Sequence, residues 1–219
     1  MDGSETGKTA TGEGFRALER AQLTQAARDL FGTFGYARTT TEALCRRAGV
    51  PVRILEEEYG SLEGLLVALH DQVTTKGLRA AEEALLAEGM DDLPMGPRTK
   101  ILFEAYVKAV TEDPHEARVT FVEVLGVSHR VDAHVKRWRD VWVDFLTGEA
   151  QRAVARGEAE PGDHRVTVMV TVGTVHEFMA HYARRSRRAQ PAEVSEELVK
   201  LALSMLGITA GSVSEEPAL

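Results

Sequence analysis

The stretch Gly35–Tyr59, GYARTTTEALCRRAGVPVRILEEEY, decides the fold of this chain. Two short segments of helical character flank Gly49, and a glycine there permits the sharp turn between them. Hydroxyl side chains at positions 39–41 precede the first segment and can cap its N-terminus. Pro51 suits the first turn of the second segment, because its missing N–H would be unpaired there anyway. The stretch therefore predicts a helix-turn-helix, whose second helix can enter a DNA major groove.

A wider set of residues makes the pattern specific: Gly35, Tyr36, Thr39, Thr40, Leu44, Cys45, Ala48, Gly49, Val50, Leu55, Tyr59, Ser61, Glu63 and Leu65. In this order they resemble the N-terminal domain of the tetracycline-repressor-like (TetR) family of bacterial regulators. The resemblance runs from about Ala21 to Leu69. It implies an N-terminal DNA-binding domain, followed by a C-terminal helical domain that binds a small molecule and forms a homodimer on a palindromic operator.

Several positions depart from the family pattern. The family usually has Ser or Thr at Pro51, Tyr at the position of Glu56, an aromatic residue at Glu58 and Lys at Leu62. In the family the Tyr and the Lys typically hold DNA phosphates, whereas here an acid and an apolar residue occupy those positions. Two hypotheses stay open: a ligand-responsive regulator, most simply a repressor, or a dimeric ligand- or protein-binding module that has lost conventional DNA binding.

The candidate DNA-binding residues lie at both ends of the first short helix, at the start of the second and along it. They are Thr40, Thr41, Arg46, Arg47, Pro51, Val52, Arg53 and Glu57. Arg53 can bind a guanine edge or a phosphate, or it can pair with Glu56 or Glu57 within the helix. Residues 15–69 contain seven Arg, no Lys and seven acids, so this domain is formally neutral. Such a domain is poorly supplied with the cations that give most non-specific DNA affinity.

Helical periodicity without any alternation of period two predicts an all-α fold of about nine helices. We expect helices over residues 15–34, two short ones in the helix-turn-helix, and then 62–87, 98–111, 115–126, 131–156, 163–188 and 192–206. Residues 1–14 should form a disordered tail, 15–60 the helix-turn-helix domain, 61–207 the ligand-binding and dimerisation domain, and 208–219 a loose tail.

The C-terminal domain should enclose a pocket for a small apolar ligand, as the resemblance implies. The candidate lining residues are Phe103, Tyr106, Phe121, Trp138, Trp142, Phe145, Met169 and His176. His176 lies inside the apolar run VTVMVTVGTVHEFM, so its ring needs a buried partner. A core histidine with its hydrogen bonds satisfied and a polar anchor for a ligand both remain possible.

The last two helices have apolar surfaces wider than one neighbour requires, which indicates a subunit interface. Candidate interface residues are Gly173, Val194, Leu198, Leu201 and Met205. The resemblance implies that these helices of two copies form a four-helix contact. The alternative is that they complete the core of a single chain.

Composition excludes several classes of function. The single cysteine, Cys45, cannot form an internal disulfide, and we expect a small buried thiol in a cytoplasmic protein. No apolar run approaches the roughly 18 residues that a membrane helix needs, so we expect no membrane partner. The sequence contains no nucleophile elbow and no metal-spaced cluster, so we expect no enzymatic activity, no metal and no cofactor. The net charge of −8 argues against binding nucleic acid without regard to sequence.

Overall fold

The computed structural model describes the backbone of residues 6–184 and 191–205, and the side chains of residues 13–184 and 194–204. Every regular element in these ranges is helical, which confirms the predicted all-α fold. In chain order the elements are α1 (Thr6–Phe34), η1 (Tyr36–Arg38), α2 (Thr41–Ala48), α3 (Val52–Tyr59), α4 (Leu62–Leu85), η2 (Met90–Asp92), α5 (Met95–Thr111), α6 (Pro114–Arg118), η3 (Val119–Glu123), α7 (His129–Ala155), α8 (Arg165–Arg184) and α9 (Pro191–Met205).

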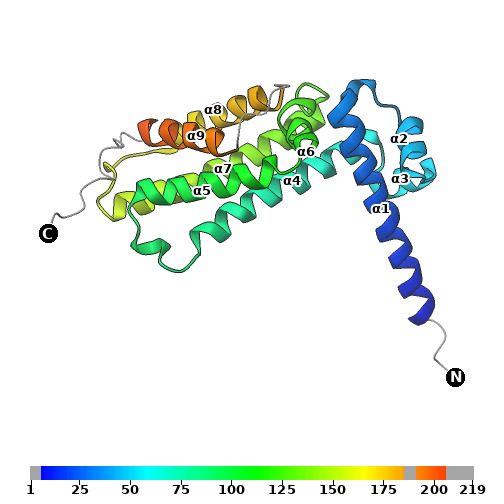
Figure 1. Cartoon of the computed structure of the whole chain (residues 1–219), viewed down its shortest axis with the longest axis horizontal. Helices are drawn as coiled ribbons and strands as arrows, with labels where there is room; N and C mark the ends of the chain where they lie inside the picture. Colours follow the sequence, from blue (N-terminus) through cyan, green and yellow to red (C-terminus); the bar gives the residue numbers. More distant parts are fainter. Residues whose placement is uncertain (1–5, 185–190, 206–219) are drawn as a thin grey trace.

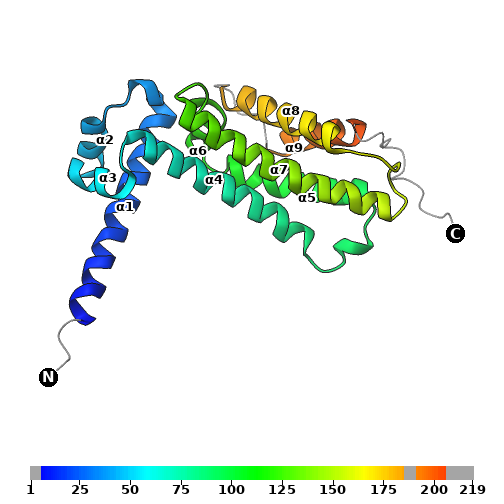
Figure 2. The ribbon, with the colours of Figure 1, turned by 180° about the vertical axis from the view of Figure 1, so that it is seen from behind.

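The helices form two groups along one elongated molecule (Figures 1 and 2). Helices α1, α2 and α3 make up the unit at one end, and the start of α1 projects away from it. Helix α4 leaves this unit and joins α5, α7, α8 and α9 in a bundle. Because α4 belongs to both groups, it connects the helix-turn-helix directly to the bundle.

Local capping follows the predicted pattern. The Thr40 hydroxyl accepts a hydrogen bond from the Ala43 N–H (3.2 Å), and the Ser61 hydroxyl accepts one from the Gly64 N–H (3.1 Å). Gly49 has a φ of 69°, a left-handed conformation that favours glycine and closes α2. Pro51 lies one residue before α3 rather than in its first turn. These caps set the sharp angle between α2 and α3.

A core of apolar side chains holds the helix-turn-helix against α1 and α4. Leu23 and Phe31 of α1, Leu44 of α2 and Leu55 of α3 are fully buried together. Cys45 is buried beside them, and burial raises the pKa of its thiol. The expectation of a small buried thiol is confirmed.

Two boundaries lie at other residues than the sequence predicts. Helix α1 begins at Thr6, so residues 6–14 belong to a helix and not to the predicted disordered tail. The predicted helix over 115–126 is present as α6 running directly into η3, a π-helical turn with i→i+5 hydrogen bonds, and this stretch ends at Glu123. Residues 1–5 and the predicted loose tail over 208–219 lie outside the described residues.

Close packing at Gly32 fixes how α1 crosses α6. A Cβ added at Gly32 would lie 2.4 Å from the Cβ and 2.7 Å from the Cα of His115. We expect Gly32→Ala to lower the free energy of unfolding by about 1–3 kcal/mol, because one of the two backbones must move. Urea denaturation measures this change.

Gly148 provides the matched control. It lies in the middle of α7, and a Cβ there would meet no atom within 4 Å. Gly148→Ala should therefore stabilise the protein by about 0.5–1 kcal/mol through helix propensity alone. Equal effects of the two substitutions would contradict the close approach of α1 to α6.

Polar contacts join the helix-turn-helix unit to the bundle. Arg28 of α1 pairs with Glu116 of α6 at 2.7 Å, and Lys76 of α4 lies 3.6 Å from the same carboxylate. Glu123 of η3 accepts a hydrogen bond from the Tyr36 N–H (2.9 Å), just before α2. The segment α6–η3 therefore lies between the two groups of helices and contacts both.

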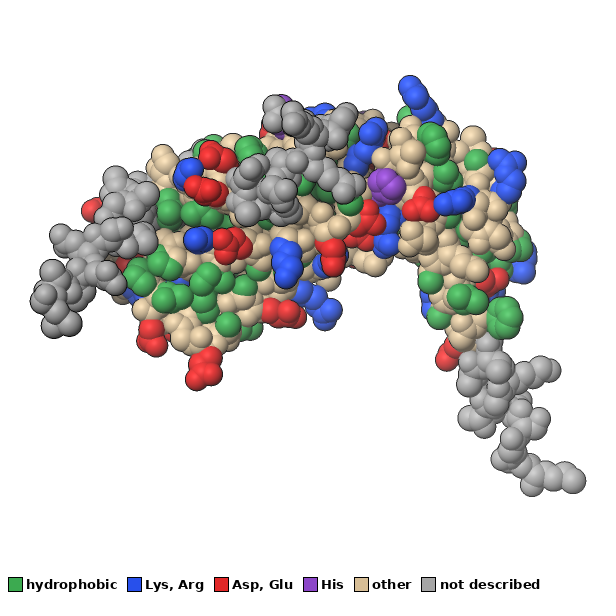
Figure 3. Space-filling model, viewed as in Figure 1, with side chains coloured by type: hydrophobic (Ala, Val, Ile, Leu, Met, Phe, Trp, Pro, Cys, Tyr) green, Lys and Arg blue, Asp and Glu red, His purple; other side chains and the backbone are tan. Residues whose placement is uncertain are grey.

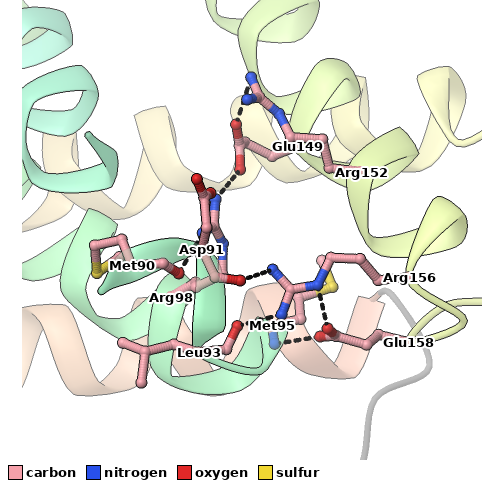
Figure 4. Close-up of polar contacts among 9 residues, drawn as sticks. All are labelled: Met90, Asp91, Leu93, Met95, Arg98, Glu149, Arg152, Arg156 and Glu158. Atoms are coloured by element: carbon pink, nitrogen blue, oxygen red, sulfur yellow. Dashed lines mark hydrogen bonds and ion pairs between the residues drawn. The ribbon is translucent and has the colours of Figure 1, made fainter. Parts of the chain in front are cut away.

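A second network fastens the segment between α4 and α5 at the far end of the bundle (Figure 4). The guanidinium of Arg98, with its side chain only 9% exposed, donates to the Met90 carbonyl and pairs with Asp91 (3.3 Å) and Glu149 (3.1 Å). Glu149 also pairs with Arg152 at 3.0 Å. Arg98 thereby links the end of the α4–α5 segment to α7.

Arg156, the residue that follows the last turn of α7, completes this network (Figure 4). It donates to the carbonyls of Asp91 (2.9 Å) and Leu93 (2.6 Å), and it pairs with Glu158 at 2.6 Å. Glu158 in turn accepts from the Met95 N–H at the start of α5. The α4–α5 segment is thus held mainly by side chains from the end of α7.

Candidate functional site

Helix α3 buries Ile54 and Leu55 and presents charged side chains outward. Arg53, Glu56 and Glu57 are exposed. Arg53 pairs with Glu57 one turn later, which is one of the two interpretations that the sequence left open. The outer face of the candidate recognition helix is therefore both acidic and basic.

Two arginines of α1 reach the acidic run of α3. Arg16 lies 2.7 Å from the Glu57 carboxylate and 3.0 Å from that of Glu58, and Arg20 lies 3.0 Å from Glu58. The hydrogen bond from Arg16 lowers the pKa of Glu57, and the same bond raises the pKa of Arg16. We call Arg16, Arg20, Arg53, Glu57 and Glu58 the α1–α3 ion-pair cluster. The cluster occupies three arginines that could otherwise bind phosphates.

The other predicted DNA-binding residues divide into engaged and available groups. Thr40 caps α2, and Arg47 pairs with Asp29 at 3.0 Å. Arg46 is exposed and has no ion-pair partner among the described residues, and the same holds for Arg38, which the sequence analysis did not select. Thr41, Pro51 and Val52 are at least partly exposed beside them. On the face seen in Figure 3, the basic side chains of this end lie apart from one another rather than gathered in one patch.

The bundle contains two neighbouring cavities, and in each the space open to the centre of a water molecule is about 60 Å³. The proximal cavity, nearer the helix-turn-helix, lies between α4, α5, η3, α7 and α8. The distal cavity lies beside the Arg98 network. Leu102, Phe103 and Leu146 line both cavities and separate them.

The structure brings six of the eight predicted ligand-contact residues together in the proximal cavity. They are Phe103, Tyr106, Phe121, Trp138, Trp142 and His176. Phe145 is not among its lining residues and packs edge-on against Trp142 instead. Met169 is 56% exposed and lines neither cavity. The structure therefore does not place Phe145 and Met169 in the lining of the proximal cavity, because the helical period gives the face of a residue but not what covers it.

His176 has one hydrogen-bond partner and lacks another. Its Nδ1 lies 3.4 Å from a guanidinium nitrogen of Arg139, and its ring meets Phe121 edge-on. Its Nε2 is buried without a partner, as is the hydroxyl of Thr120. Burial and the nearby Arg139 lower the pKa of His176 to about 4. His176 is therefore not a core histidine with its hydrogen bonds satisfied.

A buried histidine pair, which sequence analysis missed, links α4 to α7. His70 Nδ1 lies 3.1 Å from His134 Nε2, and a guanidinium nitrogen of Arg137 lies 3.3 Å from His134 Nδ1. Burial and the neighbouring His134 lower the pKa of His70 to about 3, and burial also lowers the pKa of His134. His70 lines the proximal cavity. No sequence spacing signals a pair of residues 64 positions apart.

Stability should fall as the pH drops below 6.5. The unfolded chain protonates His70 and His176 near pH 6.5, whereas the native state resists protonation down to about pH 3 and pH 4. Their contribution is complete above pH 6.5 and is lost as pH falls toward 4. The charged or titratable groups acting on the three histidines are Asp71, His134, Arg137, Arg139, His176 and Arg184.

Between pH 7 and pH 5 we expect the free energy of unfolding to decrease by about 2 kcal/mol for each of these two histidines. Denaturant unfolding at both pH values measures the decrease. His176→Phe has no titrating ring there, so its decrease should be smaller by about 2 kcal/mol. An identical decrease in both proteins would contradict a buried, neutral His176.

The predicted dimer-interface residues fall into different environments. Val194 and Leu198 are 2% and 0% exposed within the single chain, so they belong to its core, and their assignment to an interface was wrong. Leu201 is partly exposed, Gly173 is exposed, and the side chain of Met205 lies outside the described residues. Helix α9 buries its apolar face within its own bundle.

Helix α8 instead has an uncovered apolar face. Val166, Met169 and Val170 are exposed, and Gly173 follows one turn later with no atom within 4 Å of a Cβ built on it. These four positions lie on one side of the helix. We call them the α8 face.

The described part of the chain offers neither a membrane-spanning helix nor a metal-binding cluster. None of its helices is long and apolar enough to cross a membrane. The same residues contain no group of three or more His, Cys, Asp or Glu side chains that could hold a metal ion.

Residues 23–69 match the family model described as bacterial regulatory proteins, tetR family. No curated protein matches the sequence. A tetR-family regulatory protein from Rhodococcus RHA1 superimposes with a TM-score of 0.70 at 21% identity, covering 87% of this chain and 98% of that one. The fatty acid degradation regulator FadR from Bacillus halodurans has a TM-score of 0.74 at 16% identity, covering 87% and 97%.

A third solved structure is FadR from Bacillus subtilis in complex with stearoyl-CoA. It has a TM-score of 0.72 at 16% identity and covers 84% of this chain and 98% of that one. At these identities the likeness shows a shared fold. Together with the matched N-terminal segment, it confirms the resemblance to tetR-family regulators.

Proposed function

We propose that this chain, which has the fold and the N-terminal pattern of tetR-family regulators, is a homodimeric transcriptional repressor that binds a palindromic operator. A small, largely apolar ligand in the proximal cavity would alter its operator affinity. The observation that carries this proposal is the helix-turn-helix over residues 23–69, matched both by the family model and by the geometry of α2 and α3. DNA binding in turn implies a cytoplasmic location.

The available cations support contact with DNA. Arg38 and Arg46 are exposed without ion-pair partners among the described residues. Arg38 precedes α2, and Arg46 lies in its last turn. The N-terminus of a helix and its hydroxyl side chains can also bind phosphate. Arg53 lies on the outer face of α3 and pairs with Glu57. On DNA it can leave Glu57 and bind a base edge or a phosphate instead.

The α8 face supports a dimer. Its apolar side chains are covered by no described residue of the same chain, and a two-fold axis would cover the same face on both copies. A two-fold dimer would present two α3 helices to two half-sites. That arrangement fits an operator with palindromic symmetry.

The proximal cavity and α6–η3 support regulation by a ligand. Thr120 and Phe121 line the cavity, and Glu123 of the same short segment bonds the backbone at Tyr36. Suppose that η3 has two positions and that each one holds the helix-turn-helix differently. A ligand that binds one of the two positions more tightly would then shift the population toward it, by an amount set by the difference between its two affinities. FadR from Bacillus subtilis, with stearoyl-CoA bound, is an example of this fold with an amphipathic ligand.

Genome-wide capture of DNA bound to the full chain tests the proposal. We expect a small number of enriched palindromic sites, each confirmed by a gel shift at physiological salt. The double variant Arg38→Ala, Arg46→Ala should weaken the shift at every site, because it removes phosphate contacts. The absence of any enriched site would contradict the proposal.

The α1–α3 ion-pair cluster supports a second candidate function. In this alternative, the chain is a ligand-binding module that no longer binds DNA. Glu57 and Glu58 engage three of the seven arginines of residues 15–69. The same capture experiment separates the two functions, because only the repressor enriches specific sites.

A further inference from the structure

We propose that the proximal cavity selects an apolar molecule that carries a carbonyl or carboxylate oxygen, and that it rejects amines. This inference rests on the proposed function, since it specifies the chemistry of that regulator's ligand. It follows from the direction of the hydrogen bonds at three polar side chains of the cavity: His70, Thr120 and His176.

Arg139 determines which nitrogen of His176 carries the proton. A guanidinium can only donate, so His176 Nδ1, 3.4 Å from Arg139, must accept. The ring is neutral, because burial lowers its pKa to about 4, and its single proton therefore lies on Nε2. This N–H is buried and has no acceptor among the described residues. A ligand acceptor would remove the penalty of roughly 1–3 kcal/mol for an unmade buried hydrogen bond.

Arg137 determines the proton positions of the histidine pair in the same way. It donates to His134 Nδ1 (3.3 Å), so the proton of His134 lies on Nε2 and is donated to His70 Nδ1 (3.1 Å). The proton of the neutral His70 must then lie on its Nε2. No described residue accepts from that nitrogen, and His70 lines the cavity. A second imidazole N–H is therefore a donor without an acceptor.

The hydroxyl of Thr120 is the third polar group, and Thr120 is only 1% exposed. Its oxygen is buried without a partner, so it too can donate. Two of the three groups can only donate, and the third can do so. A carbonyl or carboxylate oxygen has the lone pairs that these donors require.

A protonated amine is the opposite case. It offers only donors to a site whose unpartnered groups are donors, because the Thr74 hydroxyl is already engaged with the His70 carbonyl (2.7 Å). It would also lie near the positive charge of Arg139. A carboxylate is attracted by the same charge. The remaining walls are mostly aromatic and suit an apolar body: Phe103, Tyr106, Phe121, Trp138 and Trp142. Shape and apolarity alone would not distinguish a ketone from an amine, so the donors determine the selectivity.

A matched series of probes tests the selectivity: methylcyclohexane, cyclohexyl methyl ketone, cyclohexanecarboxylate and cyclohexylmethylammonium. Both tryptophans of the chain, Trp138 and Trp142, line the cavity, so intrinsic fluorescence reports binding directly. With the full chain we expect the ketone and the carboxylate to bind about tenfold more tightly than the hydrocarbon. The ammonium should give no saturable change.

Variants assign the selectivity to the named donors. His176→Phe and the near-isosteric Thr120→Val should each lower the affinity for the ketone about tenfold and leave that for methylcyclohexane unchanged or higher. His129→Phe, at an exposed position of α7, is the control and should change none of the four affinities. Unaltered selectivity in both cavity variants would overturn the proposal.

Two further results of the probe series would contradict the inferred ligand chemistry. The ammonium could bind as tightly as the ketone, or none of the probes could bind. Either result would overturn the proposal. Neither result bears on operator binding, which the capture experiment measures without a ligand. Conversely, a chain that binds the ketone selectively but enriches no DNA site would overturn the repressor function and leave the ligand chemistry intact.

Discussion

Replacing Glu57 and Glu58 together by glutamine is expected to raise the affinity of the full chain for duplex DNA by about 10- to 100-fold at low salt. In the native chain these carboxylates hold Arg16, Arg20 and Arg53 in the α1–α3 ion-pair cluster. A glutamine side chain keeps nearly the same size but loses the charge, so the three arginines become available to phosphates. The change also removes two like charges that repel the DNA backbone.

Titration of a labelled duplex at several salt concentrations measures this effect. If the three arginines reach phosphates, the plot of log affinity against log salt should steepen by about 0.9 for each of them. Glu82→Gln with Glu83→Gln removes the same total charge from exposed positions of α4 and serves as the control. An equal gain in both double variants would mean that net charge alone is responsible and that the cluster restrains nothing.

Arg98→Ala should lower the free energy of unfolding by about 3 kcal/mol or more. Arg98 is buried and joins the Met90 carbonyl, Asp91 and Glu149 in one network (Figure 4). Removing it leaves a buried carbonyl without its donor and a mostly buried carboxylate with only one counter-charge. Both losses leave polar groups desolvated without full compensation.

The matched control for Arg98 is Arg152→Ala. Arg152 pairs with the same carboxylate of Glu149, but its side chain is 65% exposed. Its loss should lower the free energy of unfolding by less than about 1 kcal/mol, as is usual for exposed ion pairs. Urea denaturation of both variants gives the comparison. Similar losses would show that burial of Arg98 does not determine its contribution.

Much of the fold could be predicted because local signals are strong in this chain. Gly49, the hydroxyl caps at Thr40 and Ser61, and the apolar period each act within one or two helical turns. These signals placed the helix-turn-helix and the succession of helices correctly. They also selected most of the aromatic side chains around the proximal cavity, because large apolar residues on inward faces converge in a bundle.

The parts that could not be predicted depend on contacts between distant segments. The pairing of Arg16 with Glu58 spans 42 positions, and that of His70 with His134 spans 64. Met169 lies two turns before His176 on nearly the same side of α8, yet it is 56% exposed. Leu198 lies on an apolar face that the sequence shows plainly, but only the packing of α9 reveals that the chain's own bundle covers this face.

The wide turn of η3 makes this region sensitive to chain length. Thr120 and Glu123 lie in one π-helical segment, the first at the cavity and the second at the Tyr36 N–H. Losing a single amino acid there would restore ordinary α-helical register and rotate the carboxylate by about 100° around the axis. A one-codon deletion could thus disconnect sensing from DNA recognition without altering either surface. Among proteins descended from this one, the number of residues in η3, rather than their identity, would indicate whether ligand binding and DNA recognition are still coupled.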